Sequence, residues 1–208
     1  MNWTEYVDAI YVINLSKRVD RLLQISEELC KWDIPYELVN GIEKENGAEG
    51  LRDTVVQILE KSVRLKHKNI VIFEDDCVFV DSGGNPNQVM NEVIKQLPKV
   101  WDIIYLGGQC TAGFKYRHSP NLIQVDKCFA THAWMISEQG MKNILASDLG
   151  YPIDNYIVDK IQVMQNCYIT YPLLASQRAG DSDIGKAFVN WHPFIETRYY
   201  QKLSEQGI

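Results

Sequence analysis

The sequence predicts an α/β fold, with a mostly parallel central sheet flanked by helices in a single domain. Short, β-branched apolar segments alternate along the chain with longer segments whose apolar residues recur at helical spacing. Because strands that alternate with helices usually pair in parallel, this order is typical of an α/β sheet covered on both faces. The 208 residues suit one domain, spanning 1–208, with a core at about 9–185 and a C-terminal extension at 186–208.

Composition and charge restrict the classes of protein. The formal net charge of -6 argues against nucleic acid or an anionic membrane as the main partner. The five cysteines include no Cys-x-x-Cys pair, which favours reduced cytosolic thiols over a disulfide framework or a zinc site. No signal-peptide core is present, and no apolar segment approaches the roughly 20 residues that span a bilayer. We therefore expect a cytoplasmic protein, either soluble or peripheral to the inner membrane, without a transmembrane segment.

The N-terminal third predicts a strand, a helix and a second strand. Residues 9–13, AIYVI, are short and apolar, as a buried strand requires. Ser16 is expected to cap the following helix, and Pro35 to end it. Residues 36–39 form the second predicted strand, and the stretch at 47–50 is predicted as loop because of its glycines. The apolar face of the helix is formed by Leu22, Ile25, Leu29 and Trp32.

The middle of the chain repeats this alternation. A helix with an apolar face precedes a strand at 70–73, and turn residues at 82–86 precede another helix. Residues 103–106 are a further predicted strand. The segment 107–120 contains three glycines and no clear period, so we predict a long surface loop there. The helix faces consist of Val55, Ile58, Leu59 and Val63, and then of Val89, Val93, Ile94 and Leu97.

Three carboxylates follow the strand at 70–73 directly, in the segment NIVIFEDDCVF (69–79). Glu74, Asp75 and Asp76 repel one another, and their desolvation is costly unless a positive group shares the site. A hard divalent cation, Mg²⁺ or Mn²⁺, would neutralise them and leave coordination positions free for phosphate oxygens. The alternative is a solvated acidic turn, although apolar residues on both sides make that less ordinary.

A basic cluster opens the first predicted helix. Lys17, Arg18 and Arg21 lie in its first turns, where the helix dipole disfavours cations unless an anion binds at that end. Because ligands bind at the carboxyl ends of strands in such sheets, we expect Asn14, the acids at 74–76 and Gly107-Gly108 to meet in one crevice, together with these cations. A nucleotide diphosphate with a metal ion is the economical ligand. The alternative is solvent exposure of the cations, with Asp20 as a local partner.

Seven segments resemble, in the same order, the motifs of family 25 glycosyltransferases, which include lipooligosaccharide and collagen galactosyltransferases. The acidic segment resembles the family's version of the D-x-D motif. The likeness spans about residues 10 to 184, which is more specific than any single motif. The segments are YVINLSKRVDR (11–21), IPYELVNGI (34–42), NIVIFEDDCVF (69–79), WDIIYLGG (101–108), THAWMIS (131–137), YPIDNYIVD (151–159) and Ser182-Asp183-Ile184.

The resemblance implies a GT-A-like fold and an inverting, metal-dependent transferase of lipopolysaccharide or surface polysaccharide biosynthesis. It would move a hexose, galactose being the first choice, from a UDP-sugar to a glycan or glycolipid acceptor, with Mn²⁺ or Mg²⁺ as cofactor. By analogy, Asp76 and Glu74 would hold the metal. Donor-binding residues would be Asn14, Leu15, Arg18, Arg21, Glu74, Asp75, Thr131 and His132. His132 is equally interpreted as a half-buried structural histidine.

An inverting transfer needs a base for the acceptor hydroxyl. Asp154 is the first candidate, although an acid just after Pro152 is also what a helix start favours. Asp183 is the second candidate, in a loop that equally suits a plain turn.

The chain departs from the family pattern at Thr54-Val55, where family members usually carry a Ser-His pair. This departure keeps a second function open, a catalytically inactive module that binds a nucleotide sugar. A receiver-like signalling domain is a third alternative, because its acids also bind Mg²⁺ at a strand end. It ranks lower because a receiver has its acids after the first strand of a shorter chain, whereas here they follow a later strand.

Overall fold

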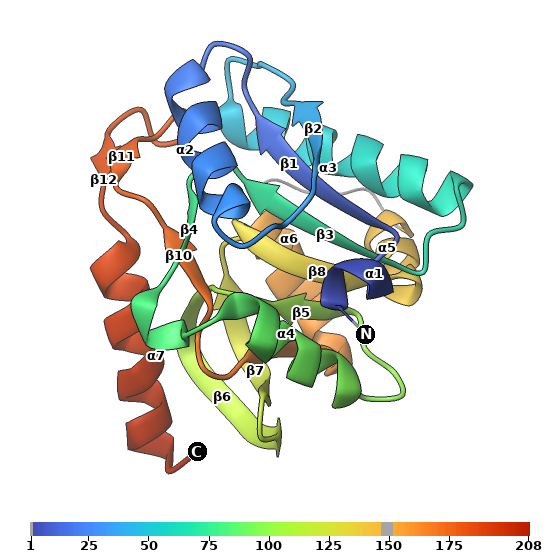
Figure 1. Ribbon diagram of the computed structural model, residues 1–208, viewed down its shortest axis with the longest axis vertical. Coiled ribbons are helices and arrows are strands. Elements are labelled where there is room, and N and C mark those ends of the chain that lie inside the picture. Colours follow the sequence, from blue (N-terminus) through green and yellow to red (C-terminus); the bar gives the residue numbers. More distant parts are fainter. Residues whose placement is uncertain (1, 147–151) are drawn as a thin grey trace.

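A computed structural model describes residues 2–146 and 152–208 (Figure 1). Its main sheet has eight strands in the order β2-β1-β3-β8-β5-β9-β7-β6, and two further pairs, β10-β4 and β11-β12, lie outside it. The main-sheet strands are β1 (Ala9–Asn14), β2 (Glu37–Asn40), β3 (Asn69–Glu74), β5 (Ile103–Tyr105), β6 (Gln109–Ser119), β7 (Leu122–Phe129), β8 (Ala133–Ser137) and β9 (Cys167–Thr170). The short pairs are β4 (Cys77–Phe79) with β10 (Ala175–Gln177), and β11 (Gly180–Asp181) with β12 (Phe188–Val189).

The central sheet is mostly parallel in strand direction. β1 pairs in parallel with β2 and β3, and β5 with β9, while β8 and β7 pair antiparallel with their neighbours. Therefore β2, β1, β3, β5, β9 and β6 point one way, and β8 and β7 point the other. With helices on both faces, this arrangement confirms the predicted α/β class with a mostly parallel central sheet flanked by helices.

Alternation along the strands builds two cores, one on each face of the sheet. Tyr11 and Ile72 point to the face covered by α3 (Gly47–Arg64), α5 (Glu138–Leu145) and α7 (His192–Gln206). Val12 and Phe73 point to the opposite face, covered by α1 (Trp3–Tyr6), α2 (Val19–Cys30) and α4 (Pro86–Lys95). Because successive residues of β1 and β3 are buried on both sides, the central positions of these strands are apolar, which is why the sequence predicts them clearly. The remaining short helical segments are α6 (Ile153–Tyr156) and the turns at Asp81–Gly83, Ile157–Ile161 and Gln162–Met164.

Most of the predicted long loop at 107–120 is strand. Residues 109–119 form β6, which pairs antiparallel with β7, and the register shifts around Gly113 and Phe114. These irregularities break the period-two alternation, because an extra residue moves the following side chains to the other face. The prediction of a loop here was therefore wrong.

Two helix starts also differ from the sequence-based expectation. Gly47 and Gly50, expected in a loop, lie in the first turn of α3, whose N-cap is Asn46 with its side chain accepting from Ala48 N at 3.1 Å. Ser16 does not cap α2, which begins at Val19. Its hydroxyl instead donates to the side chain of Asn40 at 3.4 Å.

None of the helices in the two described ranges combines the length and the apolar character that a bilayer crossing requires.

Candidate active site

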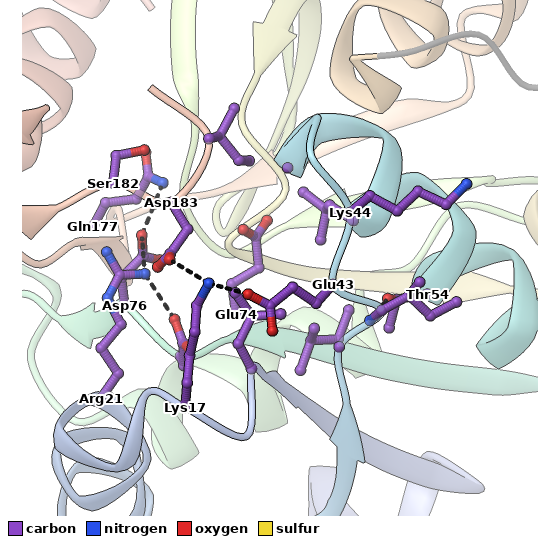
Figure 2. A pocket seen from close by; sticks show the side chains of 18 of the residues that line it. Lys17, Arg21, Glu43, Lys44, Thr54, Glu74, Asp76, Gln177, Ser182 and Asp183 are labelled. Atoms are coloured by element: carbon purple, nitrogen blue, oxygen red, sulfur yellow. Dashed lines mark hydrogen bonds and ion pairs between the residues drawn. The ribbon is translucent and has the colours of Figure 1, made fainter. Parts of the chain in front are cut away.

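A cavity of about 150 Å³ opens where β1 and β3 end (Figure 2). We call it the acidic cavity. Its walls come from the end of β1, the start of α2, the segment between β2 and α3, the turn after β3, and the segment from β10 to α7. The charged groups that line it are Lys17, Arg21, Glu43, Lys44, Glu74, Asp75, Asp76 and Asp183. Acids and bases from distant parts of the chain therefore share one enclosed space.

The three carboxylates sit on a tightly held turn between β3 and β4. The backbone N–H of Glu74 donates to the carbonyl of His132 at 2.9 Å, and the carbonyl of Asp76 accepts from Arg178 N at 2.6 Å. Thr131 Oγ1 donates to Glu74 Oε1 at 2.8 Å, which fixes the direction of that carboxyl group. The turn thus holds its acids in place through bonds to the residues just before β8 and just after β10.

Burial disfavours the charged form of these three acids. Burial, then the neighbouring charge of Asp76, raises the pKa of Glu74 well above its ordinary value. Burial also raises the pKa of Asp76, against the opposing charge of Arg21, and raises that of Asp75. In the part of the chain that the structure describes, Asp76 Oδ1 is buried without a hydrogen-bond partner. An orphaned carboxylate oxygen among like charges is an environment in which a cation would relieve an electrostatic cost.

The donor atoms suit a hard cation held mainly by one or two carboxylates. No group of three or more His, Cys, Asp or Glu among the described residues is arranged as a complete metal shell. Mg²⁺ in nucleotide sites commonly uses one or two protein carboxylates, and phosphate oxygens and waters supply the rest. Asp76, with Glu74 beside it, fits that kind of partial site.

Three cations lie around the start of α2, and each already has acidic partners. Lys17 and Arg18 precede the helix, whereas Arg21 lies in its first turns. Arg21 Nη1 lies 2.9 Å from Asp75 Oδ1 and 3.7 Å from Asp76 Oδ2. Lys17 pairs with Glu43, and its Nζ lies 3.5 Å from Asp183 (Figure 2). These pairs offset the unfavourable position of cations at a helix start.

Asn14 ends β1, and Leu15 follows it beside the acidic cavity. Leu15 lines the cavity, and Asn14 bonds two lining residues: its carbonyl accepts from Gly41 N at 2.8 Å, and its Nδ2 donates to the Leu15 carbonyl at 2.8 Å. Asn14 Oδ1 is buried without a partner among the described residues. Of the two residues predicted at the nucleoside end, Leu15 lines the cavity and Asn14 does not, and their role stays a prediction.

Thr131 and His132 stand behind Glu74 and do not line the acidic cavity. The His132 side chain is fully buried, and burial lowers its pKa to about 4. Its ring lies against the end of β5, since a Cβ on Gly107 would come within 2.7 Å of His132 Nε2. His132 is thus fully buried and not half-buried, and its role stays a prediction.

The two candidate bases lie in different surroundings. Asp183 lines the cavity, and Arg18 and Lys17 outweigh the effect of its burial and hold its pKa below the ordinary value. Asp154 lies in the first turn of α6, accepts from Asn155 N at 2.9 Å, and is near enough to contribute to the raised pKa of Glu74. Tyr151, which opens the segment containing Asp154, lies outside the described residues.

Sequence reasoning did not include several residues of the cavity. Gln177 approaches Asp76 Oδ2 at 3.5 Å from β10, about 100 positions along the chain, and no local pattern announces that contact. Glu43 and Lys44 come from the loop after β2. Thr54 was noted only as a departure from the family pattern, yet it lines the cavity and bonds both Ile42 N and the Gly50 carbonyl.

Comparisons with known proteins support the fold. No protein-family model matches the chain, and no curated protein matches its sequence significantly. Among solved structures, A197 from STIV is similar with a TM-score of 0.54 and 13% identity, covering 86% of this chain and 91% of A197. A glycosyltransferase involved in the glycosylation of the major capsid of PBCV-1 aligns with a TM-score of 0.46 and 10% identity, covering 78% and 92%. Apo UDP-glucose pyrophosphorylase aligns with a TM-score of 0.45 and 9% identity, covering 93% and 82%.

At these identities, the similarity to A197 shows a shared fold and nothing about activity. The two scores below 0.5 carry no argument for this chain, so its function has to be argued from its own cavity and motifs.

Proposed function

We propose that this protein is a metal-dependent inverting glycosyltransferase that uses a UDP-hexose as donor. The acceptor would be a glycan or glycolipid of lipopolysaccharide or surface polysaccharide, and galactose is the hexose that the family 25 resemblance favours. At a coarser level, the proposal is a transferase that uses a nucleotide sugar.

One observation carries the proposal: carboxylates and cations line the same cavity at the ends of β1 and β3. Asp76, with an orphaned buried oxygen, lies 3.7 Å from Arg21, and Lys17 lines the cavity as well. A nucleotide diphosphate with its divalent cation matches both kinds of group, because the cation meets the acids and the phosphates meet the bases. A purely structural ion-pair network would not need the unpaired Asp76 oxygen or the open volume.

Each side chain then has a definite task. Asp76 and Glu74 would hold Mn²⁺ or Mg²⁺, which when bound would act as a Lewis acid on the diphosphate leaving group. Thr131 orients Glu74, and Arg21 positions Asp75 through its 2.9 Å ion pair. Leu15 and Ile42 supply the apolar wall beside which a nucleoside can lie.

We assign the base to Asp154 in preference to Asp183. A base has to take the proton of the acceptor hydroxyl as the new glycosidic bond forms. Asp183 is held by Arg18 and Lys17, which lower its pKa and weaken it as a base. Asp154 makes no ion pair with any of the described residues.

The second candidate is an inactive module that binds the donor without transfer. Thr54 occupies the place of the family's serine and is engaged in two backbone hydrogen bonds, and Val55 beside it is buried in the core. Neither residue can supply acid–base chemistry from that place. Donor binding is common to both candidates, so turnover alone separates them.

The test measures thermal stability with UDP and a panel of UDP-hexoses, with and without Mn²⁺. A ligand at about a hundredfold its Kd stabilises by about 2.7 kcal/mol, which a melting curve resolves. We expect a Mn²⁺-dependent shift that Asp76→Asn abolishes and Asp20→Asn, a change of an exposed acid outside the cavity, retains. A shift without release of UDP from any donor, alone or with glycan acceptors, would support the inactive module. No shift with any nucleotide would refute the proposal.

A further inference from the structure

A small hairpin closes one side of the acidic cavity. The β11–β12 hairpin (180–189) pairs Gly180 with Val189 and Asp181 with Phe188, and it is not hydrogen-bonded to the main sheet as a strand. Its turn makes backbone hydrogen bonds within the hairpin. Ser182 N donates to the Ala187 carbonyl at 2.9 Å, and Lys186 N donates to the Ser182 carbonyl at 2.8 Å. Figure 1 shows the hairpin beside the start of α2, at the edge of the molecule. It is therefore a unit that can move without loss of sheet structure.

The hairpin is fastened to the start of α2 by the three cations there, of which Lys17 and Arg21 line the cavity. Arg18 Nη1 donates to the Asp183 carboxylate at 2.5 Å and to the Asp181 carbonyl at 3.0 Å. Arg21 Nη2 donates to the same Asp181 carbonyl at 2.7 Å. Lys17 Nζ lies 3.5 Å from the other oxygen of Asp183. Two arginines and a lysine thus converge on oxygens of one short segment.

These oxygens occupy the positions around the cations that a phosphate group would take. Arginine and lysine bind carboxylate and phosphate with the same charge-assisted hydrogen bonds, so the two anions compete for the same donors. Few apolar contacts oppose displacement of the hairpin, because Phe188 is 69% and Ile184 49% exposed. Segments held mainly by polar contacts open at low free-energy cost.

We propose that the β11–β12 hairpin is an autoinhibitory latch in which Asp183 stands in for the ligand's phosphate. With the latch closed, Arg18, Arg21 and Lys17 are engaged by the chain itself. A diphosphate that binds these cations releases Asp183 and the Asp181 carbonyl, and the hairpin leaves the start of α2. This inference rests on the proposed function for the identity of the phosphate compound, whereas the latch contact itself does not depend on it.

The hairpin also packs against Gly47, which has no side chain, at the start of α3. A substitution at Gly47 can therefore open the hairpin without a change of charge. A Cβ added at Gly47 would lie 2.9 Å from the Asp183 carbonyl oxygen and 3.2 Å from Ile184 Cα. Both atoms are backbone of the hairpin, so Gly47→Ala would push the hairpin away. A Cβ at Gly180 would meet nothing within 4 Å, which makes Gly180→Ala the matched control.

Glu43 provides the matched control for charge. It pairs with Lys17 and lines the cavity, as Asp183 does, but it belongs to the loop after β2 and does not tie the hairpin to α2. Asp183→Asn and Glu43→Gln therefore remove one negative charge each from the same cavity. Only the first variant removes a latch contact.

The test combines hydrogen–deuterium exchange with binding of inorganic pyrophosphate by titration calorimetry, on the full chain. We expect Asp183→Asn and Gly47→Ala to speed exchange of amides in 180–189 and to bind pyrophosphate about tenfold more tightly, as a site freed from a closed state populated about 90% of the time should. Glu43→Gln and Gly180→Ala should leave exchange of the hairpin unchanged.

Several results would overturn the latch. Equal effects of Asp183→Asn and Glu43→Gln on both readouts would show a simple charge effect. Wild-type exchange rates in both Asp183→Asn and Gly47→Ala would show that the contact does not hold the hairpin. Faster exchange in these two variants without any response to a UDP-sugar would instead retain the latch and reject the proposed donor, so the two failures are distinguishable.

Discussion

At the scale of single residues, His132 is a neutral histidine built into the core behind the acidic turn. Its side chain is fully buried, and burial lowers its pKa to about 4 from an ordinary 6.5. Between these two values the unfolded chain binds a proton that the folded chain does not. The stability due to neutral His132 is therefore present above about pH 6.5 and is lost as the pH falls towards 4.

We predict that His132→Asn removes this loss of stability at acid pH. The difference in free energy of unfolding between wild type and variant should shrink by about 3 kcal/mol from pH 7 to pH 4, since a pKa shift of one unit corresponds to about 1.36 kcal/mol. Denaturant unfolding at several pH values measures it. Ile72→Val, a core substitution without a titratable group, should show a constant difference. A constant difference for His132→Asn as well would contradict the assigned protonation.

Residue types alone indicated part of the cavity. Asp76 was identified because acids directly after an apolar strand are costly to desolvate. Arg21 was identified because the helix dipole disfavours a base at a helix start. Gln177 and Glu43 were not, because their places depend on how β10 and the loop after β2 fold back, which leaves no local mark in the sequence. The roles assigned to the predicted residues remain predictions.

At the scale of elements, Thr54 ties the loop after β2 to α3. Its hydroxyl accepts from Ile42 N at 2.8 Å and donates to the Gly50 carbonyl at 2.8 Å. Ile42 and Thr54 both line the acidic cavity, so this fastening sets the shape of one wall. Gly50 makes the approach possible, because a Cβ there would lie 2.2 Å from the Ile42 carbonyl oxygen.

We predict that Thr54→Val destabilises the fold by about 1–3 kcal/mol, because the part-buried Ile42 N–H loses its acceptor and the Gly50 carbonyl loses its donor while the side-chain volume stays similar. Thr54→Ser keeps the hydroxyl and should cost less. Guanidinium unfolding of both variants measures the difference. Equal stabilities would show that the loop does not depend on this hydroxyl.

The elements that the sequence predicted best are those with a continuous physical signature. β1 and β3 are buried on both faces and therefore apolar at their central positions, and α2 and α3 show regular apolar spacing. β6 was missed because bulges around Gly113 break its alternation. The start of α3 was missed because Gly47 and Gly50 are selected for close backbone approach, against helix propensity.

At the scale of the whole molecule, the acidic cavity links stability to protons and cations. Glu74 and Asp76 have pKa values raised by burial, so the folded chain holds protons that the unfolded chain releases. Their contribution is fully present below the ordinary carboxyl pKa and is lost as the pH rises through the raised values. A bound divalent cation would take over the neutralising role of these protons at higher pH.

We therefore predict that Mn²⁺ raises the melting temperature more at about pH 8 than at about pH 5, because metal ligands must be deprotonated. Asp76→Asn should remove most of this difference, and its own stability should fall less than that of wild type between the two pH values. Differential scanning fluorimetry with and without Mn²⁺ measures both. A shift of equal size at the two pH values would argue against metal binding by these acids.

The C-terminal helix α7 covers one face of the sheet, and it also affects how the protein behaves in concentrated solution. β6 is the last strand of the main sheet, and α7 packs against it while the Gln206 side chain accepts from Phe114 N at 2.8 Å and donates to its carbonyl at 3.0 Å. Gln206 thus imitates a neighbouring strand and protects an edge that would otherwise recruit one from another molecule. The Gln206→Ala variant should self-associate in light scattering at concentrations where the wild-type chain remains monodisperse. Equal scattering by the two chains would show that the edge does not need this protection.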